Sequence, residues 1–175
     1  MFDPLTLTAP PDARAARYAD VERAIESLLA GEDDWVAAMA TVASELHQAF
    51  DYYDWTGFYR AAAGEQLVIG PFQGGHGCLR IPFGKGVCGA AARTRKAQLV
   101  PDVRAFEGHI ACSNTSRSEL VVPIVARDGR LLGVLDVDSD ARAAFTRLDQ
   151  EGLQRLCDRL GTRFGGPGGE SAPPL

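Results

Sequence analysis

Three of the four cysteines lie within 35 residues of one another, each in a polar or glycine-rich stretch. Cys78 follows FQGGHG, Cys88 stands in GKGVCGAA, and Cys112 lies between GHIA and SNTS. A structural cysteine behaves as a small apolar residue and gains little in such surroundings. This placement favours thiol chemistry, and three small buried hydrophobes remain the alternative. Cys157, beside Leu156 in a helical pattern, is interpreted as a core or surface residue.

The surroundings of Cys88 suggest one way in which a thiol could be activated. If Gly86 or Val87 begins a short helix, Cys88 lies near its positive end, where the pKa of a thiol is lowered. His76 and His109 each stand close to a cysteine in the sequence, and either could stabilise a thiolate. The alternative is that both are loop histidines without a function.

Three acidic residues occupy positions that β-strands disfavour. Asp136 and Asp138 alternate with apolar residues in LLGVLDVDS, and residues two apart in a strand point to the same face of the sheet. Two acids on one face repel each other unless they meet a cation or share a proton, and an ammonium group would fit between them. Glu119, at the start of the partner strand, could join them across the hairpin. The alternative is the solvated face of an edge strand.

Hydrophobic periodicity and turn residues predict one α+β domain over residues 12–164, after an irregular arm over 1–11 and before a disordered tail over 165–175. Adjacent strands without long crossovers favour an antiparallel sheet of about six strands, with helices layered on one face. Trp55 begins the first strand and is interpreted as core in preference to a ligand platform. The predicted helices span 12–30, about 35–50 after a cap at Asp33 or Asp34, 86–97 and about 146–164; the predicted strands span 55–60, 66–72, 79–83, 98–103 and the two halves of 118–139, joined at Asp128-Gly129.

The composition argues against several classes of function. The net charge is −5, and lysine and arginine nowhere form a run, which argues against a nucleic-acid surface. No stretch of about 18 apolar residues exists, and the N-terminus lacks a secretory signal pattern, so we expect no membrane association and a cytoplasmic location. The cysteine spacings match no common zinc pattern, and no phosphate-binding loop is present, so we expect neither a metal nor an organic cofactor.

From about residue 18 to residue 160 the sequence resembles the GAF-domain free methionine-(R)-sulfoxide reductases. The most specific segments are GPFQG, RIPFGKGVCG, FEGHIAC, SELVVP and GVLDVDS. GAF domains in general share the sheet but not the three cysteines, so the combination points to this family. The resemblance implies a single GAF-like α+β domain, whose six-stranded antiparallel sheet is flanked by helices, and often a homodimer, to which two amphipathic N-terminal helices could contribute.

The resemblance also implies an activity, which is the reduction of free L-methionine-(R)-sulfoxide to L-methionine. A thiolate would attack the sulfur while a carboxyl group held protonated by its acidic neighbours supplies the proton. A sulfenic acid would follow, then a disulfide, which thioredoxin or a similar dithiol would reduce. The implied roles are catalytic for Cys112, resolving for Cys78, recycling for Cys88, substrate-binding for Glu119, Asp136 and Asp138, and aromatic wall for Trp55.

A different class of function is compatible with the same fold. A GAF module could bind a small ligand, or sense thiol oxidation, without turning over a substrate. Consumption of free methionine sulfoxide in the presence of a dithiol would distinguish the enzyme from both alternatives.

Overall fold

The structure is a computed structural model that describes residues 3–110 and 115–166. Its elements follow the predicted order closely, and Asp34, one of the two expected caps, accepts a hydrogen bond from the amide of Ala37 at 2.7 Å. The elements are α1 (Pro11–Leu28), α2 (Trp35–Ala49), β1 (Trp55–Ala62), β2 (Gln66–Gln73), β3 (Arg80–Pro82), α3 (Gly86–Thr94), β4 (Gln98–Val100), the 3₁₀ turn η1 (Val103–Ala105), β5 (Ser118–Val125), β6 (Leu131–Ser139) and α4 (Arg147–Phe164).

All six strands form one antiparallel sheet in the order β3-β2-β1-β6-β5-β4. The prediction of an α+β fold with an antiparallel sheet of about six strands is therefore confirmed. β5 and β6 are joined at the predicted Asp128-Gly129 turn, where Gly129 takes a φ of +85° that favours glycine. Neither strand of this hairpin is an edge strand, because β5 and β6 each have a neighbouring strand on both sides.

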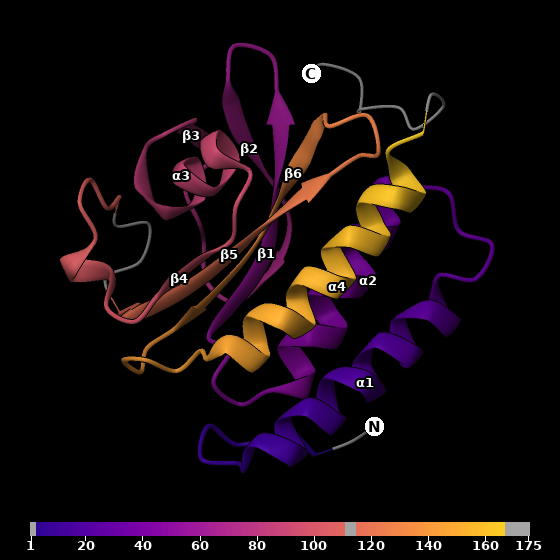
Figure 1. Cartoon of the computed structure of the whole chain (residues 1–175), viewed down its shortest axis with the longest axis vertical. Coiled ribbons are helices and arrows are strands. Elements are labelled where there is room, and N and C mark those ends of the chain that lie inside the picture. Colours follow the sequence, from indigo (N-terminus) through magenta and orange to yellow (C-terminus); the bar gives the residue numbers. More distant parts are fainter. Residues whose placement is uncertain (1–2, 111–114, 167–175) are drawn as a thin grey trace.

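Helices cover both faces of the sheet, which corrects the expectation that they would all lie on one face (Figure 1). α2 and α4 pack on one face, with α1 outside them, and α3 packs on the other. The physical reason is that the central strands carry apolar side chains on both faces. Phe58 and Leu120 point into the larger core under α2 and α4, whereas Tyr59 and Val121 point into the smaller core under α3.

A buried polar network ties α1 to α4. The Arg14 guanidinium donates to Oδ2 of Asp149 at 2.7 Å, and the hydroxyls of Tyr18 and Tyr52 each donate to Oδ1 at 2.9 Å. The amide and hydroxyl of Thr146 also donate to Asp149, which closes the capping box that begins α4. One carboxylate therefore satisfies a buried cation, two phenols and a helix terminus.

Two further observations concern the ends of the described chain and its helices. Before α1, Leu5 forms an isolated parallel bridge to Phe50 at the end of α2. Among the described residues, no helix has both the length and the apolar character that crossing a bilayer requires.

We expect Asp149→Ala to lower the free energy of unfolding by about 3–5 kcal/mol, because it leaves the Arg14 guanidinium buried without its anion. Urea unfolding followed by circular dichroism measures the change. Asp158→Ala is the control, since it removes an exposed aspartate from the same helix and should cost less than about 0.5 kcal/mol. Equal losses in the two variants would contradict a special role for the network.

Candidate active site

The three predicted acids come together on the α3 face of the central hairpin. Glu119 on β5 lies directly opposite Asp138 on β6, and Asp136 follows two residues earlier on the same face. Leu135 and Val137, which alternate with the aspartates, point into the larger core instead. Glu119 and Asp136 are only 6% and 5% exposed. Side chains on the solvated face of an edge strand would be far more exposed, so that alternative for the acids is ruled out.

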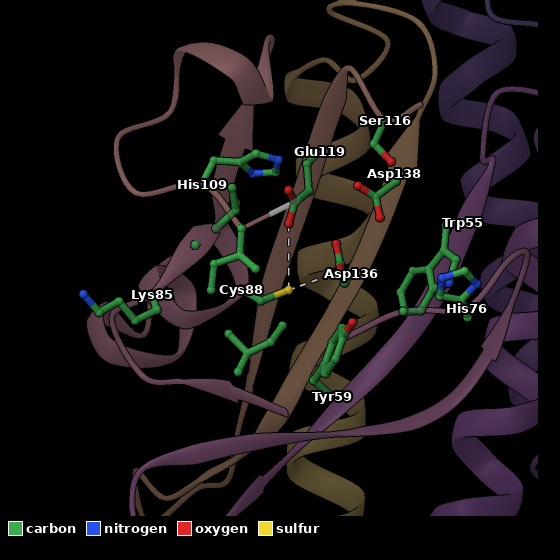
Figure 2. A pocket seen from close by; sticks show the side chains of 15 residues that line it. Trp55, Tyr59, His76, Lys85, Cys88, His109, Ser116, Glu119, Asp136 and Asp138 are labelled. Atoms are coloured by element: carbon green, nitrogen blue, oxygen red, sulfur yellow. Dashed lines mark hydrogen bonds between the residues drawn. The ribbon is translucent and has the colours of Figure 1, made fainter. Parts of the chain in front are cut away.

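The acids line a pocket between the sheet and the start of α3 (Figure 2). The empty space in the pocket and at its open mouth is about 510 Å³, solvent included. β1, β5 and β6 form its floor, and the start of α3 and two loops form its walls. The lining residues are Trp55, Tyr59, His76, Gly77, Ile81, Lys85, Gly86, Val87, Cys88, His109, Ile110, Ser116, Glu119, Asp136 and Asp138.

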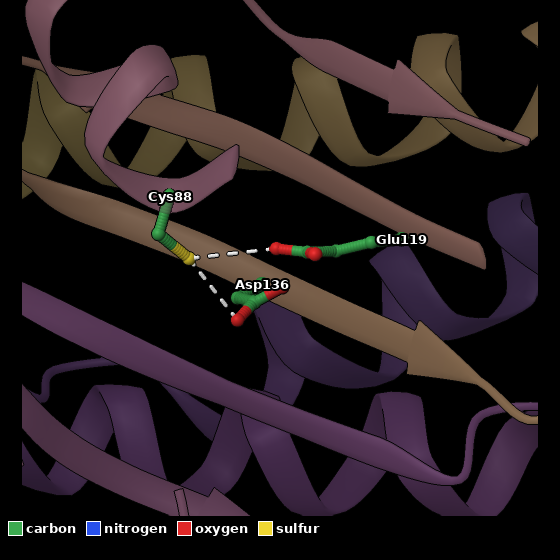
Figure 3. Close-up of side chains that lie close together, drawn as sticks. All are labelled: Cys88, Glu119 and Asp136. Carbon is green, nitrogen blue, oxygen red and sulfur yellow. Dashed lines mark hydrogen bonds between the residues drawn. The ribbon is translucent and has the colours of Figure 1, made fainter. Parts of the chain in front are cut away.

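Cys88 points from α3 into the acid cluster (Figure 3). Its Sγ lies 3.1 Å from Oδ2 of Asp136 and 3.8 Å from Oε1 of Glu119, and the thiol donates to both. Cys88 is the third residue of α3, as expected, but the expected lowering of its pKa is wrong. Burial, followed by the neighbouring carboxylates, raises the pKa of this thiol well above its usual value, since both outweigh the field of one short helix.

The carboxyl groups are held toward their neutral forms. Burial, and then the charges of Asp136 and Asp138, raise the pKa of Glu119. Burial, and then the charge of Asp136, raise the pKa of Asp138, while hydrogen bonding to Ser116 acts in the opposite direction. Burial raises the pKa of Asp136 to about 7, against the stabilising hydrogen bonds from Cys88 and Glu119. The cluster therefore holds protons near neutral pH, at a site that would also attract a cation.

An aromatic wall faces the acids from β1. The ring of Trp55 stacks on Tyr59 at 5.9 Å and on Phe72 at 5.5 Å, and its Nε1 donates to the carbonyl of Gly75 at 2.9 Å. A Cβ at Gly57, between Trp55 and Tyr59 on the same face of β1, would lie 2.5 Å from the Trp55 ring, so glycine is required there. Trp55 is thus both buried and pocket-lining, and the two interpretations of this residue do not exclude each other.

The cysteines separate into two groups. Cys112, the predicted nucleophile, lies outside the described residues. Cys78 follows pocket-lining Gly77 and is disulfide-bonded, whereas Cys88 and Cys157 carry free thiols. Cys157 is fully buried in the larger core, on the other side of the sheet from the pocket, as its helical pattern predicted.

Several pocket residues were missed by the sequence reasoning. Tyr59 could have been found, because it lies four residues after Trp55 in the same strand and therefore on the same face. Lys85, Ile110 and Ser116 belong to loops and a helix start, where no periodicity indicates direction. His76 and His109, for which a functional role was left open, both line the pocket.

One set of pocket residues has the composition of a cation site. Donor atoms of Cys88, Glu119 and Asp136 lie within 4.8 Å of one another, and all three residues are buried. One sulfur and two carboxylate oxygens are a donor set that zinc accepts. The absence of a metal remains a prediction from the sequence.

Comparison with known proteins places this chain in a family. The GAF domain family matches residues 34–164. A free methionine-R-sulfoxide reductase of Escherichia coli strain K12 is 42% identical over 143 residues, which are 82% of this chain and 86% of that protein. The chain belongs to the GAF-domain free methionine-(R)-sulfoxide reductases. This membership confirms the family resemblance and the prediction that the chain is an enzyme of the oxidoreductase class.

Two further relatives agree with this assignment. A free methionine-R-sulfoxide reductase of Saccharomyces cerevisiae is 43% identical, over 75% of this chain and 76% of that protein. An X-ray structure of free methionine-R-sulfoxide reductase from Neisseria meningitidis, in complex with its substrate, is 45% identical and superposes with a TM-score of 0.83. That match covers 94% of this chain and 96% of the Neisseria chain.

We expect Asp136→Asn to raise the free energy of unfolding at pH 8. The folded protein holds the pKa of this carboxyl at about 7 rather than its ordinary 3.8. Ionising it therefore costs more in the folded than in the unfolded state, and the folded state loses stability as pH rises through that window. At about 1.4 kcal/mol for each pKa unit, the gain at pH 8 is at most about 4 kcal/mol.

Urea unfolding at a series of pH values measures this gain. It should shrink as the pH falls below 7 and vanish below about pH 3, where the Asp136 carboxyl of the parent protein is protonated in both the folded and the unfolded state. Asp158→Asn, at an exposed position of α4, is the control for a substitution that does not touch the cluster. A gain that does not change with pH would mean that the substitution acts through packing rather than through the charge.

Proposed function

We propose that this protein reduces free L-methionine-(R)-sulfoxide to L-methionine by thiol chemistry. The family membership supports the activity, and the substrate-bound Neisseria relative supports the substrate class. The observation that carries the proposal is the cluster of three acids in the pocket, two of them buried, since such acids either stay protonated or meet a cationic partner. The α-ammonium group of a free amino acid supplies that partner.

Binding of the ammonium group and delivery of a proton are coupled in this proposal. Glu119, Asp136 and Asp138 have raised pKa values in the free protein. An ammonium group within reach stabilises their ionised forms and so drives protons out of the cluster. We assign delivery of the proton to Asp136, because its pKa of about 7 suits a general acid at neutral pH. Its Oδ1 is also buried without a hydrogen-bond partner among the described residues.

The chemical steps balance with two cysteines and one external dithiol. The Cys112 thiolate attacks the sulfur of the sulfoxide, whose oxygen takes a proton from the cluster. Oxygen transfer then leaves methionine and a Cys112 sulfenic acid. The Cys78 thiol attacks the sulfenic sulfur, which releases water and forms a Cys78–Cys112 disulfide. The external dithiol reduces this disulfide to two thiols and is itself oxidised to a disulfide.

The roles of the two upstream cysteines follow from their environments. Cys78 is disulfide-bonded and lies beside the pocket, which supports it as the resolving thiol. The thiol of Cys88 is buried, donates hydrogen bonds to two carboxyl groups and has a raised pKa. Because the thiolate is the nucleophilic form, Cys88 is a poor nucleophile in this state. We propose that Cys88 mainly holds Asp136 in place, and that its participation in recycling needs prior release from the acids.

The partners are proposed on chemical grounds. Thioredoxin or a similar dithiol fits as reductant, because its second thiol can resolve the mixed disulfide that its first thiol forms with the protein. A homodimer is proposed from the amphipathic α1 and α2, on which Leu28 and Val36 are exposed. A cytoplasmic location follows if the protein depends on such a reductant.

A direct assay tests the activity. Purified protein, dithiothreitol and free methionine-(R)-sulfoxide should yield methionine, measured by amino-acid chromatography, whereas the S epimer should remain. A non-catalytic sensor module would bind the sulfoxide or undergo thiol oxidation without producing methionine, and that result would overturn the proposal.

We expect Cys112→Ser to abolish methionine formation, because a serine hydroxyl stays un-ionised near neutral pH and attacks sulfur poorly. The measurement is kcat/KM with dithiothreitol as reductant. Cys157→Ser is the control, since Cys157 lies in the core on the other side of the sheet. Activity of Cys112→Ser within a few-fold of the parent would refute the assignment of the nucleophile.

For Cys78→Ser we expect the first turnover to survive and recycling by thioredoxin to slow. Oxygen transfer needs only Cys112, whereas resolution of the sulfenic acid needs the second thiol. Rapid-quench measurement with excess enzyme reports the first turnover, and steady-state thioredoxin oxidation reports recycling. Mass spectrometry of the oxidised parent should find Cys78 linked to Cys112. A Cys88–Cys112 link alone would exchange the roles of the two upstream cysteines.

A further inference from the structure

Two unpartnered buried polar atoms face the same pocket. Within the described residues, Nδ1 of His109 and Oδ1 of Asp136 are buried and make no hydrogen bond, and both residues line the pocket. A buried polar atom without a partner is costly. Two such atoms in one small-molecule pocket, one on an acid and one on a base, therefore indicate a ligand with both a donor and an acceptor group.

The charges of a free amino acid match this pair. Three acids are available for its ammonium group, but its carboxylate also has to find a donor in a pocket that is rich in acids. Among the lining residues, only Lys85, His76 and His109 have side chains that can carry a positive charge. The ammonium and carboxylate of an α-amino acid are bonded to the same carbon, so the donor for the carboxylate must lie beside the acids.

Position distinguishes the three candidates. Lys85 is exposed, precedes α3 and makes no capping hydrogen bond with its side chain. His76 is exposed and lies on the Trp55 side of the pocket, away from Glu119 (Figure 2). The imidazole of His109 lies on the Glu119 side of the pocket, where the acid cluster ends. Of the three, His109 is the one placed next to an acid and partly buried.

The backbone around His109 is held against α3. The amide of His109 donates to the carbonyl of Phe106 at 3.1 Å, and the amide of Gly86 donates to the carbonyl of Gly108 at 3.2 Å. Ile110 packs against Gly86, where an added Cβ would lie 3.4 Å from its side chain. The helix that carries Cys88 is therefore also in contact with the segment that carries His109.

We propose that the Nδ1–H group of His109 binds the α-carboxylate of the substrate and makes the enzyme select against substrates whose carboxyl group is blocked. This inference rests on the proposed function, because it assigns one subsite within that reaction. Burial lowers the pKa of His109, so the ring is neutral near neutral pH and donates from a single nitrogen. A neutral imidazole donates a hydrogen bond to the substrate carboxylate. It adds no positive charge that would pair with the acids in place of the substrate ammonium group.

The test compares three substrates that differ only at the two polar groups. They are free methionine-(R)-sulfoxide, its N-acetyl derivative and its α-carboxamide. In the parent protein both derivatives should be poor substrates. In His109→Ala, kcat/KM for the free amino acid should fall by about 10- to 150-fold, which corresponds to loss of a hydrogen bond to a charged group. The value for the carboxamide should change little, whereas discrimination against the N-acetyl derivative should persist.

Conservative variants make the test specific to one nitrogen. The amide nitrogen of asparagine can occupy about the position of Nδ1 in histidine, whereas that of glutamine reaches the position of Nε2. His109→Asn should therefore retain most of the preference for a free carboxylate, and His109→Gln should lose it. Thermal unfolding of both variants checks that they fold equally well. His76→Asn and Lys85→Met should keep the parent's ratio between the free acid and the carboxamide.

The possible outcomes are distinguishable. An equal fall in kcat for the free acid and the carboxamide in His109→Ala would place the imidazole at the sulfoxide oxygen and overturn the proposal. Loss of carboxylate preference in His76→Asn or Lys85→Met, but not in His109→Ala, would move the subsite to that residue and overturn it too. If the parent protein fails to reduce the free sulfoxide at all, the proposed function itself is wrong, which is a separate result.

Discussion

The crowding of three carboxyl groups, two of them buried, on one face of the β5–β6 hairpin is the constraint on which the site depends. Three neighbouring carboxyl groups with little access to water cannot all be ionised without a cation. In the proposed function, the cluster holds protons when it is empty and gives them up when the ammonium group of the substrate enters. This single property links recognition of an ammonium group to the supply of a proton, so the same side chains can serve both binding and chemistry.

The elements around the cluster limit its exposure to water. α3 covers the acids and directs Cys88 at Asp136, which ties the thiol to the cluster as a hydrogen-bond donor. The aromatic residues of β1 close the opposite side, and glycine at position 57 lets Trp55 lie flat along the strand. A thiol in this setting is stabilised as the protonated form. Reactivity is therefore assigned to the cysteines of the loops rather than to the cysteine of the helix.

The other face of the sheet supplies the stability that a buried acid cluster removes. The larger core joins α2 and α4 to the apolar side of the same β5–β6 hairpin whose other side carries the acids. The network around Asp149 then fixes α1 to the start of α4. In contrast to the active-site acids, Asp149 is fully matched by donors, including a buried guanidinium. These two acidic sites therefore differ in character, since Asp149 is satisfied by donors whereas Asp136 has an oxygen without a hydrogen-bond partner among the described residues.

Much of this architecture could be predicted from the sequence alone. The strand alternation of LLGVLDVDS determined that Asp136 and Asp138 share a face, because the period of two in a strand is set by the backbone itself. The Asp128-Gly129 turn indicated that Glu119 could join them, and a cap at Asp33 or Asp34 indicated where α2 begins. The sequence could not determine the pKa of Cys88, because position in a helix is local, whereas burial and the approach of two carboxyl groups from β5 and β6 come from distant parts of the chain. For the same reason only the tertiary structure decided that α3 lies on the opposite face from the other helices and that His109 shares a pocket with the acids, since loops and short helices carry no periodicity that states what they will pack against.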